Sequence, residues 1–192
     1  MKIGSFELNY FSHHYNNPSI NERRIEIPIA LKFLEIVNNE CTEIGCVTPY
    51  YIDSKHKVID LYDDHPKAIH IDALNHDYSG QNCLSISTIE HFGEIYNDPQ
   101  NIGKYFDKDL GYKGLLKIIE NANKYLISFP LGLNRNLEES VRNSKFKFFI
   151  LKRDSQNNWI REESDSFDYE YAKPFPFANA ICVITNVEDF YS

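Results

Sequence analysis

The sequence has no long hydrophobic run, and no apolar stretch approaches the ~20 residues that a membrane-spanning helix needs. The first residues, Met1 to Glu7, contain no apolar segment followed by a small-residue cleavage site, so no signal peptide is predicted. Both absences favour a cytoplasmic protein. With 192 residues, 42% of them hydrophobic, the chain is long enough for one well-buried core and too short for two ordinary domains.

Cysteine is scarce, and its spacing does not match the common zinc motifs. The four cysteines, at positions 41, 46, 83 and 182, form no C-x-x-C pair, and we interpret them as reduced core residues. The histidines and acids of the middle region do not form a compact ligand pair on one helix either. No metal site is therefore predicted from His65, His70, Asp72, His76 and Asp77.

Positive charge is also scarce, since 20 lysines and arginines face 28 acids and the net charge is −8. A protein that binds nucleic acid through its phosphates concentrates basic residues on one face, so nucleic acid is disfavoured as a partner. We interpret the small basic group at Lys145, Lys147, Lys152 and Arg153 as the solvated face of a strand pair.

Two catalytic signatures are missing as well. The sequence has no G-x-S-x-G motif, so a Ser-His-Asp hydrolase would lack its nucleophile elbow. The first candidate ligand-binding turn lacks G-x-G-x-x-G, which disfavours a dinucleotide-dependent oxidoreductase.

A spaced series of short apolar runs is present instead. Glu43-Ile44-Gly45 closes one run, and Lys57-Val58-Ile59-Asp60-Leu61 begins twelve residues after Gly45. This pattern predicts a strand, a tight turn and a second strand that ends in an acid, as in doubly wound α/β proteins that hold a nucleoside. Asp60 is placed to accept hydrogen bonds from ribose hydroxyls, and Gly45 would let the backbone approach the ligand. Further elements follow at 69–74 and 82–91.

In this order the motifs resemble the class I S-adenosylmethionine-dependent methyltransferases. The resemblance spans roughly residues 21–186 and rests on Glu-x-Gly at 43–45, Asp60, Asp72-Ala73-Leu74, the run Ser-Ile-Ser-Thr-Ile-Glu-His at 85–91, and Phe129-Pro130-Leu131-Gly132. It implies a small-molecule methyl acceptor, such as a sugar or nucleotide-sugar hydroxyl. It also implies S-adenosylmethionine as cofactor, bound by Glu43, Gly45, Asp60, Leu61, Asp72, Ala73 and Ser87.

The chain departs from the family at its first turn, where Glu-x-Gly-x-Gly-x-Gly is usual. Here Cys46-Val47-Thr48-Pro49-Tyr50 follows Gly45, and these bulkier residues would crowd the methionine end of the ligand. A scaffold or binding module that has lost the cofactor is therefore the alternative to an enzyme.

His91, beside Glu90 at the end of the fourth strand, is the candidate general base for a hydroxyl acceptor. Its alternative is a histidine that caps a helix or bonds a backbone carbonyl. In the resembled fold, the region before the first strand lies over the cofactor and acceptor. Tyr15, Asn21 and Arg23 are thus candidates to bind the substrate, with surface charge and helix capping as the alternative.

The acids of the series have structural alternatives too. Asp60 and Asp72, the latter near an expected adenine edge, would otherwise cap a following helix. Glu43 lies inside a strand, where a carboxylate needs a partner: a backbone donor, a lysine, or the cofactor's ammonium through water.

We predict a cap or arm over residues 1–20 and one α/β domain over 21–192. Its expected sheet is doubly wound, mostly parallel and seven-stranded, with an antiparallel C-terminal strand. The segments that begin at Cys41, Asn82 and Lys124 should be adjacent parallel strands, with Gly45 and His91 at the same carboxyl-terminal edge. A helix should start at Asn21, its predicted N-cap, and be kinked or delayed by Pro28. The other expected elements are strands near 41–44, 57–60, 68–71, 82–87, 124–129, 146–152, 159–161 and 179–185, a helix at 111–122, and a helix capped by Asn136.

Overall fold

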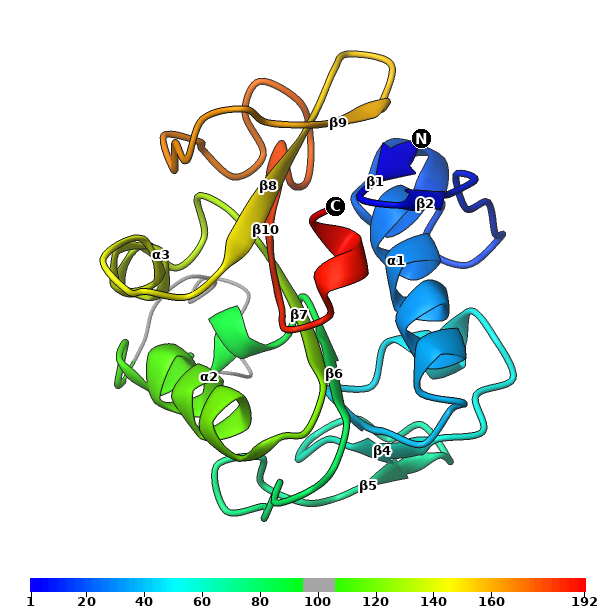
Figure 1. The fold of residues 1–192 in the computed structure, drawn as a ribbon, viewed down its shortest axis with the longest axis vertical. Helices are drawn as coiled ribbons and strands as arrows, with labels where there is room; N and C mark the ends of the chain where they lie inside the picture. Colours follow the sequence, from blue (N-terminus) through cyan, green and yellow to red (C-terminus); the bar gives the residue numbers. More distant parts are fainter. Residues whose placement is uncertain (95–105) are drawn as a thin grey trace.

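The fold is built on one large mixed sheet. The computed structural model describes residues 1–94 and 106–192. In the described part, eight strands pair in the order β5-β4-β3-β6-β7-β10-β8-β9 (Figure 1). Their bounds are β3 (Thr42–Ile44), β4 (Lys57–Ile59), β5 (Ala68–Ile69), β6 (Cys83–Ile86), β7 (Tyr125–Pro130), β8 (Phe148–Arg153), β9 (Trp159–Arg161) and β10 (Ala180–Thr185). A separate hairpin pairs β1 (Lys2–Ile3) with β2 (Phe6–Glu7).

The sheet is mostly parallel, as predicted. The neighbours β5, β4, β3, β6 and β7 all pair in parallel. β10 runs antiparallel to both β7 and β8, so β8 points the same way as the first five strands. Among residues 1–94 and 106–192 the sheet has eight strands where seven were expected, because β9 returns antiparallel along β8 and adds an edge.

Numbered in chain order, the five parallel strands read 3-2-1-4-5, an order known from open α/β sheets. The chain reverses direction across the sheet between β3 and β6. The predicted adjacency of β3, β6 and β7 as parallel strands is confirmed.

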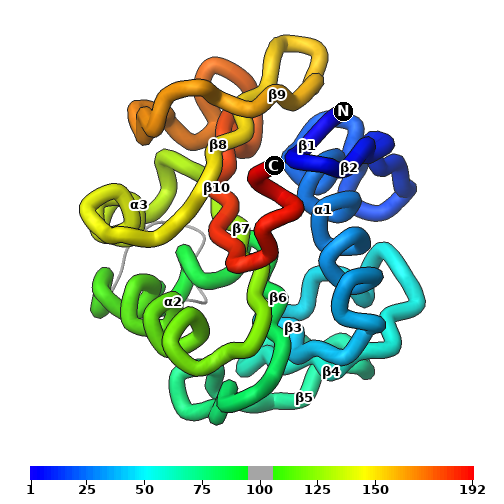
Figure 2. The backbone as a smooth tube through the Cα atoms, viewed as in Figure 1, coloured from blue at the N-terminus to red at the C-terminus, as the bar shows by residue number. Residues whose placement is uncertain are grey.

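Helices cover both faces of this sheet (Figures 1 and 2). α1 (Arg23–Ile36) lies on one face, and α2 (Leu110–Asn121) and α3 (Arg135–Arg142) lie on the other. Successive strand residues point to opposite faces. In β10, Val183 therefore packs into the core beneath α1, whereas Cys182 and Ile184 pack beneath α2 and α3. Burial on both faces explains why these strands read as continuous apolar runs.

Four short 3₁₀ helices complete the described secondary structure. They are η1 (Pro18–Ile20), η2 (Thr48–Tyr50), η3 (Ile89–His91) and η5 (Glu188–Phe190). η2 follows β3 and η3 follows β6, so both lie after the carboxyl ends of the two strands where the chain order reverses.

The N-terminal segment, predicted as a cap or arm, contributes to the core on the α1 side. Ile3 is fully buried in the same cluster as Phe190 of η5. The backbone N–H of Ser5 also donates to the carbonyl of Asp189 at 2.9 Å. The two ends of the chain accordingly lie close together in Figure 1.

Pro28 was expected to kink or delay the helix. α1 begins at Arg23, so the late start is wrong. Proline has no N–H, which leaves the carbonyl of Arg24, four residues earlier, without its helical donor. The backbone N–H of Phe11 donates to that carbonyl at 2.9 Å. The preceding segment thus supplies the hydrogen bond that Pro28 removes, and the helix continues through it.

The helix caps also differ from the prediction. Glu22 is the N-cap of α1, and Asn21 instead accepts from the N–H of Arg23 through its Oδ1. At α3 the cap is Asn134, whose side chain accepts from the N–H of Leu137. Asn136, the predicted cap, donates to Asp109 at 3.1 Å.

A buried carboxylate fastens the first turn of α1 to the sheet. Glu26 is 1% exposed, and its Oε1 accepts from Ser87 Oγ at 2.9 Å and from Ser128 Oγ at 2.7 Å. Its Oε2 forms an ion pair with Arg23. Burial raises the pKa of Glu26, and the positive charge of Arg23 opposes that rise. Glu26 therefore joins α1 to the carboxyl ends of β6 and β7.

Replacing Glu26 by alanine should destabilise the fold by about 3–5 kcal/mol, because the substitution leaves Arg23 without its main partner inside the protein. Urea denaturation measures the change. Glu35→Ala is the matched control on the same helix, since its carboxylate is exposed and its pair with Lys32 should contribute less than about 1 kcal/mol. Equal effects of the two substitutions would contradict the role of Glu26.

Candidate functional site

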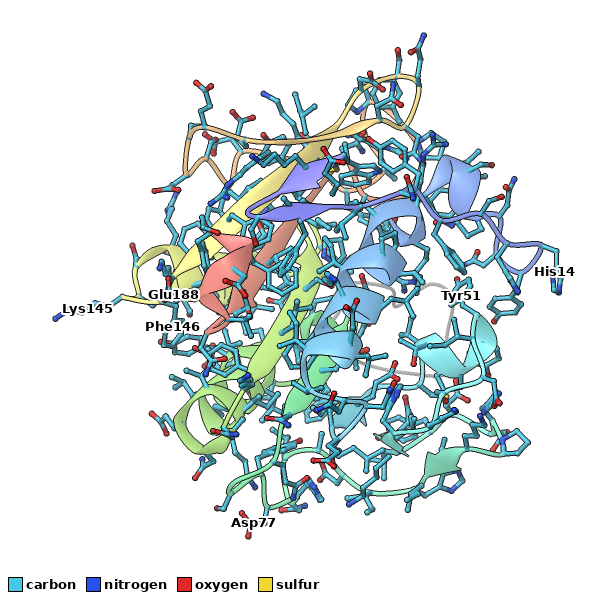
Figure 3. The ribbon with its side chains drawn as sticks, turned by 45° about the vertical axis from the view of Figure 1, so that its right-hand side comes forward. His14, Tyr51, Asp77, Lys145, Phe146 and Glu188 are labelled. Carbon is cyan, nitrogen blue, oxygen red and sulfur yellow. The ribbon has the colours of Figure 1, made fainter. Side chains whose placement is uncertain are left out.

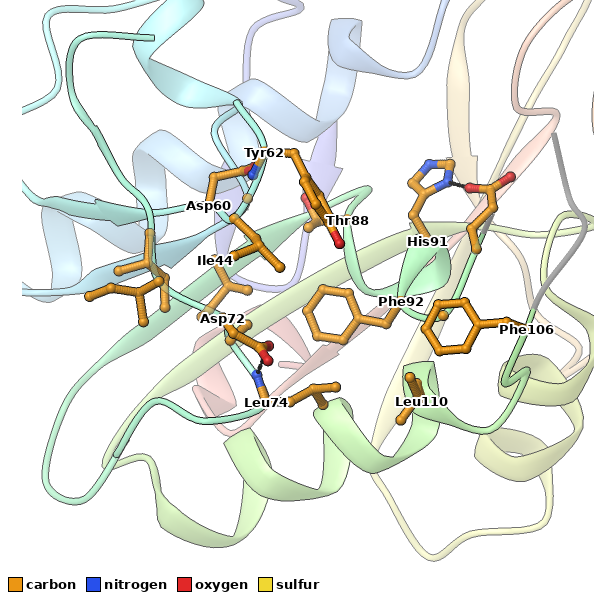
Figure 4. A pocket seen from close by; sticks show the side chains of 17 residues that line it. Ile44, Asp60, Tyr62, Asp72, Leu74, Thr88, His91, Phe92, Phe106 and Leu110 are labelled. Atoms are coloured by element: carbon orange, nitrogen blue, oxygen red, sulfur yellow. Dashed lines mark hydrogen bonds and ion pairs between the residues drawn. The ribbon is translucent and has the colours of Figure 1, made fainter. Parts of the chain in front are cut away.

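A pocket opens at the carboxyl edge of the sheet, where the loops after β3, β4, β5 and β6 converge (Figure 4). Its hollow measures about 730 Å³, counting the part that is open to solvent. The lining is mostly apolar and consists of Ile44, Gly45, Ile59, Asp60, Leu61, Tyr62, Ile71, Asp72, Ala73, Leu74, Thr88, His91, Phe92, Gly93, Glu94, Phe106 and Leu110. Ligands of open α/β sheets bind at such an edge, beside the point where the strand order reverses.

The structure brings together six of the eleven residues singled out from the sequence. Gly45, Asp60, Leu61, Asp72, Ala73 and His91 all line this pocket. The prediction that Gly45 and His91 lie at the same edge is confirmed. The other five, Glu43, Ser87, Tyr15, Asn21 and Arg23, are not part of its lining.

Glu43 holds the turn after β3. Its side chain is fully buried, and Oε1 accepts from the backbone N–H groups of Val47 at 3.1 Å and Thr48 at 2.8 Å. Oε2 contacts the Thr48 hydroxyl and lies 2.7 Å from Nε2 of His56. Of the partners considered for Glu43, the structure shows backbone donors, together with a histidine that sequence reasoning missed. Glu43 therefore fixes the conformation of the turn and is not part of the pocket lining.

Asp60 connects the same turn to the loop after β4. Its Oδ2 accepts from the N–H of Cys46 at 3.0 Å, and its Oδ1 accepts from Tyr62 and Asp63, each at 2.9 Å. A carboxylate offers about four acceptor positions, so one remains for a ligand. No helix follows β4 within the described residues 60–67, so the capping role considered for Asp60 is replaced by these loop contacts.

Asp72 forms a turn at the opposite side of the pocket. Its Oδ1 accepts from the N–H of Leu74 at 2.8 Å, and its Oδ2 accepts from the side chain of Asn75 at 2.7 Å. Each oxygen keeps one further acceptor position. Asp72 can thus bind a donor in the pocket while it shapes the 72–75 loop.

Aromatic side chains supply the apolar wall next to α2. Phe92 packs directly onto Gly114 of α2, where an added Cβ would lie 2.7 Å from two atoms of its ring. Phe106 and Leu110 stand beside Phe92 in the close view (Figure 4). This wall offers a flat apolar surface of the kind on which a planar ring packs.

His91 is held by two acids. Its Nδ1 contacts the carboxylate of Glu94, and its Nε2 lies 3.6 Å from Oε1 of Glu90. Among the described contacts of the His91 ring are thus two carboxylates, in addition to the alternatives considered from the sequence. An imidazole oriented through one nitrogen by a carboxylate is a common arrangement for proton transfer through the other nitrogen.

Glu90 lies beneath His91 and is fully buried. Burial raises its pKa to about 7, the positive charge of His91 opposes the rise, and Glu26 adds to it. The carbonyl of Glu90 accepts from the Asn134 side chain at 2.9 Å, which links η3 to α3. A carboxyl group that titrates near neutral pH therefore lies next to the pocket histidine.

The remaining predicted residues lie outside the pocket for identifiable reasons. Ser87 turns toward α1 and donates to Glu26. Asn21 is 2% exposed and Arg23 is paired with Glu26, so both belong to the network at the start of α1. Of the alternatives considered, surface charge does not describe Arg23, whose charge is paired with the buried Glu26. Asn21 accepts from the N–H of Arg23 at the start of α1, but the N-cap is Glu22.

Tyr15 lies on a neighbouring aromatic surface. Its ring stacks on Tyr50, with ring centroids 4.9 Å apart and an angle of 9° between the planes. The Tyr50 hydroxyl donates to Asp63 at 2.9 Å, which connects this surface to the loop that carries Tyr62. Figure 3 shows Tyr51 and His14 on this same side of the molecule.

The basic group noted in the sequence does not form a continuous face. Lys147 pairs with Glu188 and Lys152 with Glu162, while Arg153 turns toward the carbonyls of Ile20 and Pro176. Lys145 extends away from the body in Figure 3.

Sequence reasoning missed several lining residues, above all Thr88, Phe92 and Glu94. The spacing His91-x-x-Glu94 is a usable signal, because residues three apart on a helical turn lie on one face. Phe92 and Phe106 carry no such signal, since their position depends on packing against α2.

In residues 1–94 and 106–192, no three His, Cys, Asp or Glu side chains are grouped so that they could hold a metal ion. Within the same ranges, no helix has the length and apolar character needed to cross a membrane. The four cysteines are buried and free.

Comparison of the chain with protein-family models, with curated proteins and with solved structures found no match.

The buried Glu90 should make stability depend on pH. Because its pKa is raised from 4.5 to about 7, the folded protein keeps a proton that the unfolded chain loses between these values. This contribution is complete below about pH 4.5 and is lost as the pH rises to about 7, so the free energy of unfolding should fall across that window by about 3 kcal/mol.

The side chain of Glu90→Gln does not titrate, so the free energy of unfolding of this variant should not show the decrease between pH 4.5 and 7. Urea denaturation of both proteins from pH 4.5 to 8 measures the difference. Glu120→Gln, at an exposed position on α2, reports the effect of the same substitution on the surface. A constant difference in stability between wild type and Glu90→Gln over this range would contradict the raised pKa.

Proposed function

We propose that the chain is an S-adenosylmethionine-dependent methyltransferase that acts on a small acceptor, such as a sugar or nucleotide-sugar hydroxyl. The observation that carries the proposal is the acidic pocket at the switch point between β3 and β6, with Asp60 and Asp72 at neighbouring strand ends. In this proposal the strands from β5 to β8 form the doubly wound seven-stranded sheet of the resembled family, and β9 is an added edge strand.

The charge of the pocket favours this cofactor over a nucleotide. Its described lining contains Asp60, Asp72, Glu94 and His91, and no lysine or arginine. A phosphate group would face carboxylates without a basic partner, which is unfavourable in a partly buried site. A sulfonium carries a positive charge and would be attracted instead.

The turn after β3 points to the same class of ligand. Backbone N–H groups at such turns bind phosphates in nucleotide-binding proteins. Here the N–H of Gly45 donates to the Ile59 carbonyl, that of Cys46 to Asp60, and those of Val47 and Thr48 to Glu43. All four N–H groups already donate to other groups in the protein, and three of them donate to the carboxylates of Asp60 and Glu43. The turn therefore does not offer a phosphate site.

In the proposed reaction the leaving group is already activated, so alignment and removal of one proton are the main tasks of the protein. Asp60 would accept from the ribose, Asp72 from the adenine edge, and Phe92 would contact the ring. His91, oriented by Glu94, would remove the acceptor's proton. The exposed ring of Tyr15, 43% accessible, is a candidate surface for the acceptor.

A non-catalytic binding module is the second candidate, and a specific contact favours it. The side chain of Thr88 fills the space over Gly45, where the resemblance expects the cofactor to approach the backbone. A chain that retained the fold without the cofactor would show such a closed turn.

Titration calorimetry with S-adenosylhomocysteine separates the two candidates. The enzyme proposal predicts binding in the micromolar range and much weaker binding of ADP, because ADP brings phosphates to an acidic pocket. Asp72→Ala should weaken binding about tenfold to a hundredfold, since hydrogen bonds to charged groups contribute about 1.5–3 kcal/mol.

Asp77→Ala is the matched control, because Asp77 also accepts from a backbone N–H two residues on but is not part of the pocket lining. Absence of binding at millimolar S-adenosylhomocysteine would support the binding module and contradict the enzyme.

Once a screen of sugars and nucleotide-sugars identifies an acceptor, His91→Asn should lower turnover by roughly 10²–10⁴ and leave the affinity for S-adenosylhomocysteine intact. Release of S-adenosylhomocysteine from S-adenosylmethionine measures turnover. Near-full turnover in the variant would show that His91 is not the base.

A further inference from the structure

The side chain of Thr88 lies directly against the Cα of Gly45. A Cβ added to Gly45 would lie 2.1 Å from Thr88 Oγ1, 2.4 Å from its Cγ2 and 2.7 Å from its Cβ. Contacts below 3.0 Å are essentially never made by real Cβ atoms. Gly45 is therefore required both by Thr88 and by its own backbone φ of +84°, whereas the sequence suggested that its small size served the ligand.

Thr88 is fixed in this position. Its hydroxyl donates to the carbonyl of Ile86 at 2.9 Å, and its carbonyl accepts from the N–H of His91 at 3.0 Å. A β-branched side chain also has few alternative rotamers. Figure 4 shows Thr88 between the Asp60 side of the pocket and His91.

The pocket does not extend into the turn past this contact. Its described lining includes Gly45 and Thr88 but none of the next three residues, Cys46, Val47 and Thr48. The backbone donors of these three residues are used by Asp60 and Glu43. The open space is thus bordered by Asp60, Asp72, His91 and Phe92, and Thr88 lies where the lining stops short of the turn.

We propose that Thr88 is a specificity-determining residue that limits the size of the 5′ substituent on a bound nucleoside. A nucleoside with a small 5′ group fits without moving Thr88, whereas an amino-acid tail has to displace it. This inference rests on one part of the proposed function, the nucleoside site, and the resemblance places the methionine end at the Gly45 turn.

Two substitutions separate volume from hydrogen bonding. Thr88→Ala removes Oγ1 and Cγ2, the two atoms closest to Gly45. Thr88→Val keeps a side chain of similar shape but removes the hydroxyl. Calorimetry with 5′-methylthioadenosine and S-adenosylhomocysteine on wild type and both variants tests the proposal, with thermal unfolding as a check that each variant is folded.

Thr88→Ala should tighten S-adenosylhomocysteine binding by about tenfold or more, the usual effect of one methyl-sized steric conflict. Its affinity for 5′-methylthioadenosine should stay within about twofold of wild type, and Thr88→Val should match wild type with both ligands. A third pattern separates the two proposals: wild type binds 5′-methylthioadenosine but not S-adenosylhomocysteine, and Thr88→Ala binds both. This result would support the role of Thr88 in a nucleoside site and contradict the proposed methyltransferase.

Other outcomes overturn the inference. If both ligands bind and Thr88→Ala leaves their affinity ratio unchanged, Thr88 does not limit the tail, and the proposed function still stands. Equal tightening by Thr88→Val would show that the hydroxyl contact, and not the volume, controls binding. If neither ligand binds any of the three folded proteins, the pocket is not a nucleoside site and both proposals fail.

Discussion

The carboxylate of Glu43 determines the arrangement of the whole carboxyl edge. It lies fully buried in β3, where an unsatisfied charge would be very costly, so donors must come to it. The turn after the strand folds back and supplies two backbone N–H groups and a hydroxyl, and His56 supplies a ring nitrogen. This requirement directs the backbone donors of the turn toward the strand and away from the pocket.

The chemistry of the pocket follows from that arrangement. Asp60 accepts the hydrogen bond from the N–H of Cys46, which is not bound by Glu43. The turn therefore offers the pocket no free backbone N–H group that could attract an anion. The lining is left with three acids and one histidine on a mostly apolar wall. A neutral or positively charged nucleoside suits such a pocket better than a phosphorylated one, and this preference is the physical basis of the proposed cofactor.

The sheet and the location of the pocket could be predicted from the sequence. Strands buried on both faces read as short apolar runs, and residues that follow parallel strands meet at one edge, which is why Asp60, Asp72 and His91 share a pocket. Contacts between distant segments could not be predicted in this way. Ser87 donates to Glu26, 61 residues away in the sequence. The N–H of Phe11 donates to the carbonyl of Arg24, which has no helical donor because residue 28 is proline. Neither contact produces a local pattern in the sequence.

A crystal structure of the protein grown with S-adenosylhomocysteine is the most direct test of the central claim, that the acidic carboxyl-edge pocket holds a nucleoside. The account predicts that the adenosine part lies between Asp60, Asp72 and Phe92, with a ribose hydroxyl within hydrogen-bond distance of Asp60 and with Thr88 displaced where the tail passes Gly45. Ligand bound elsewhere, with this pocket empty and its side chains unmoved, would contradict it.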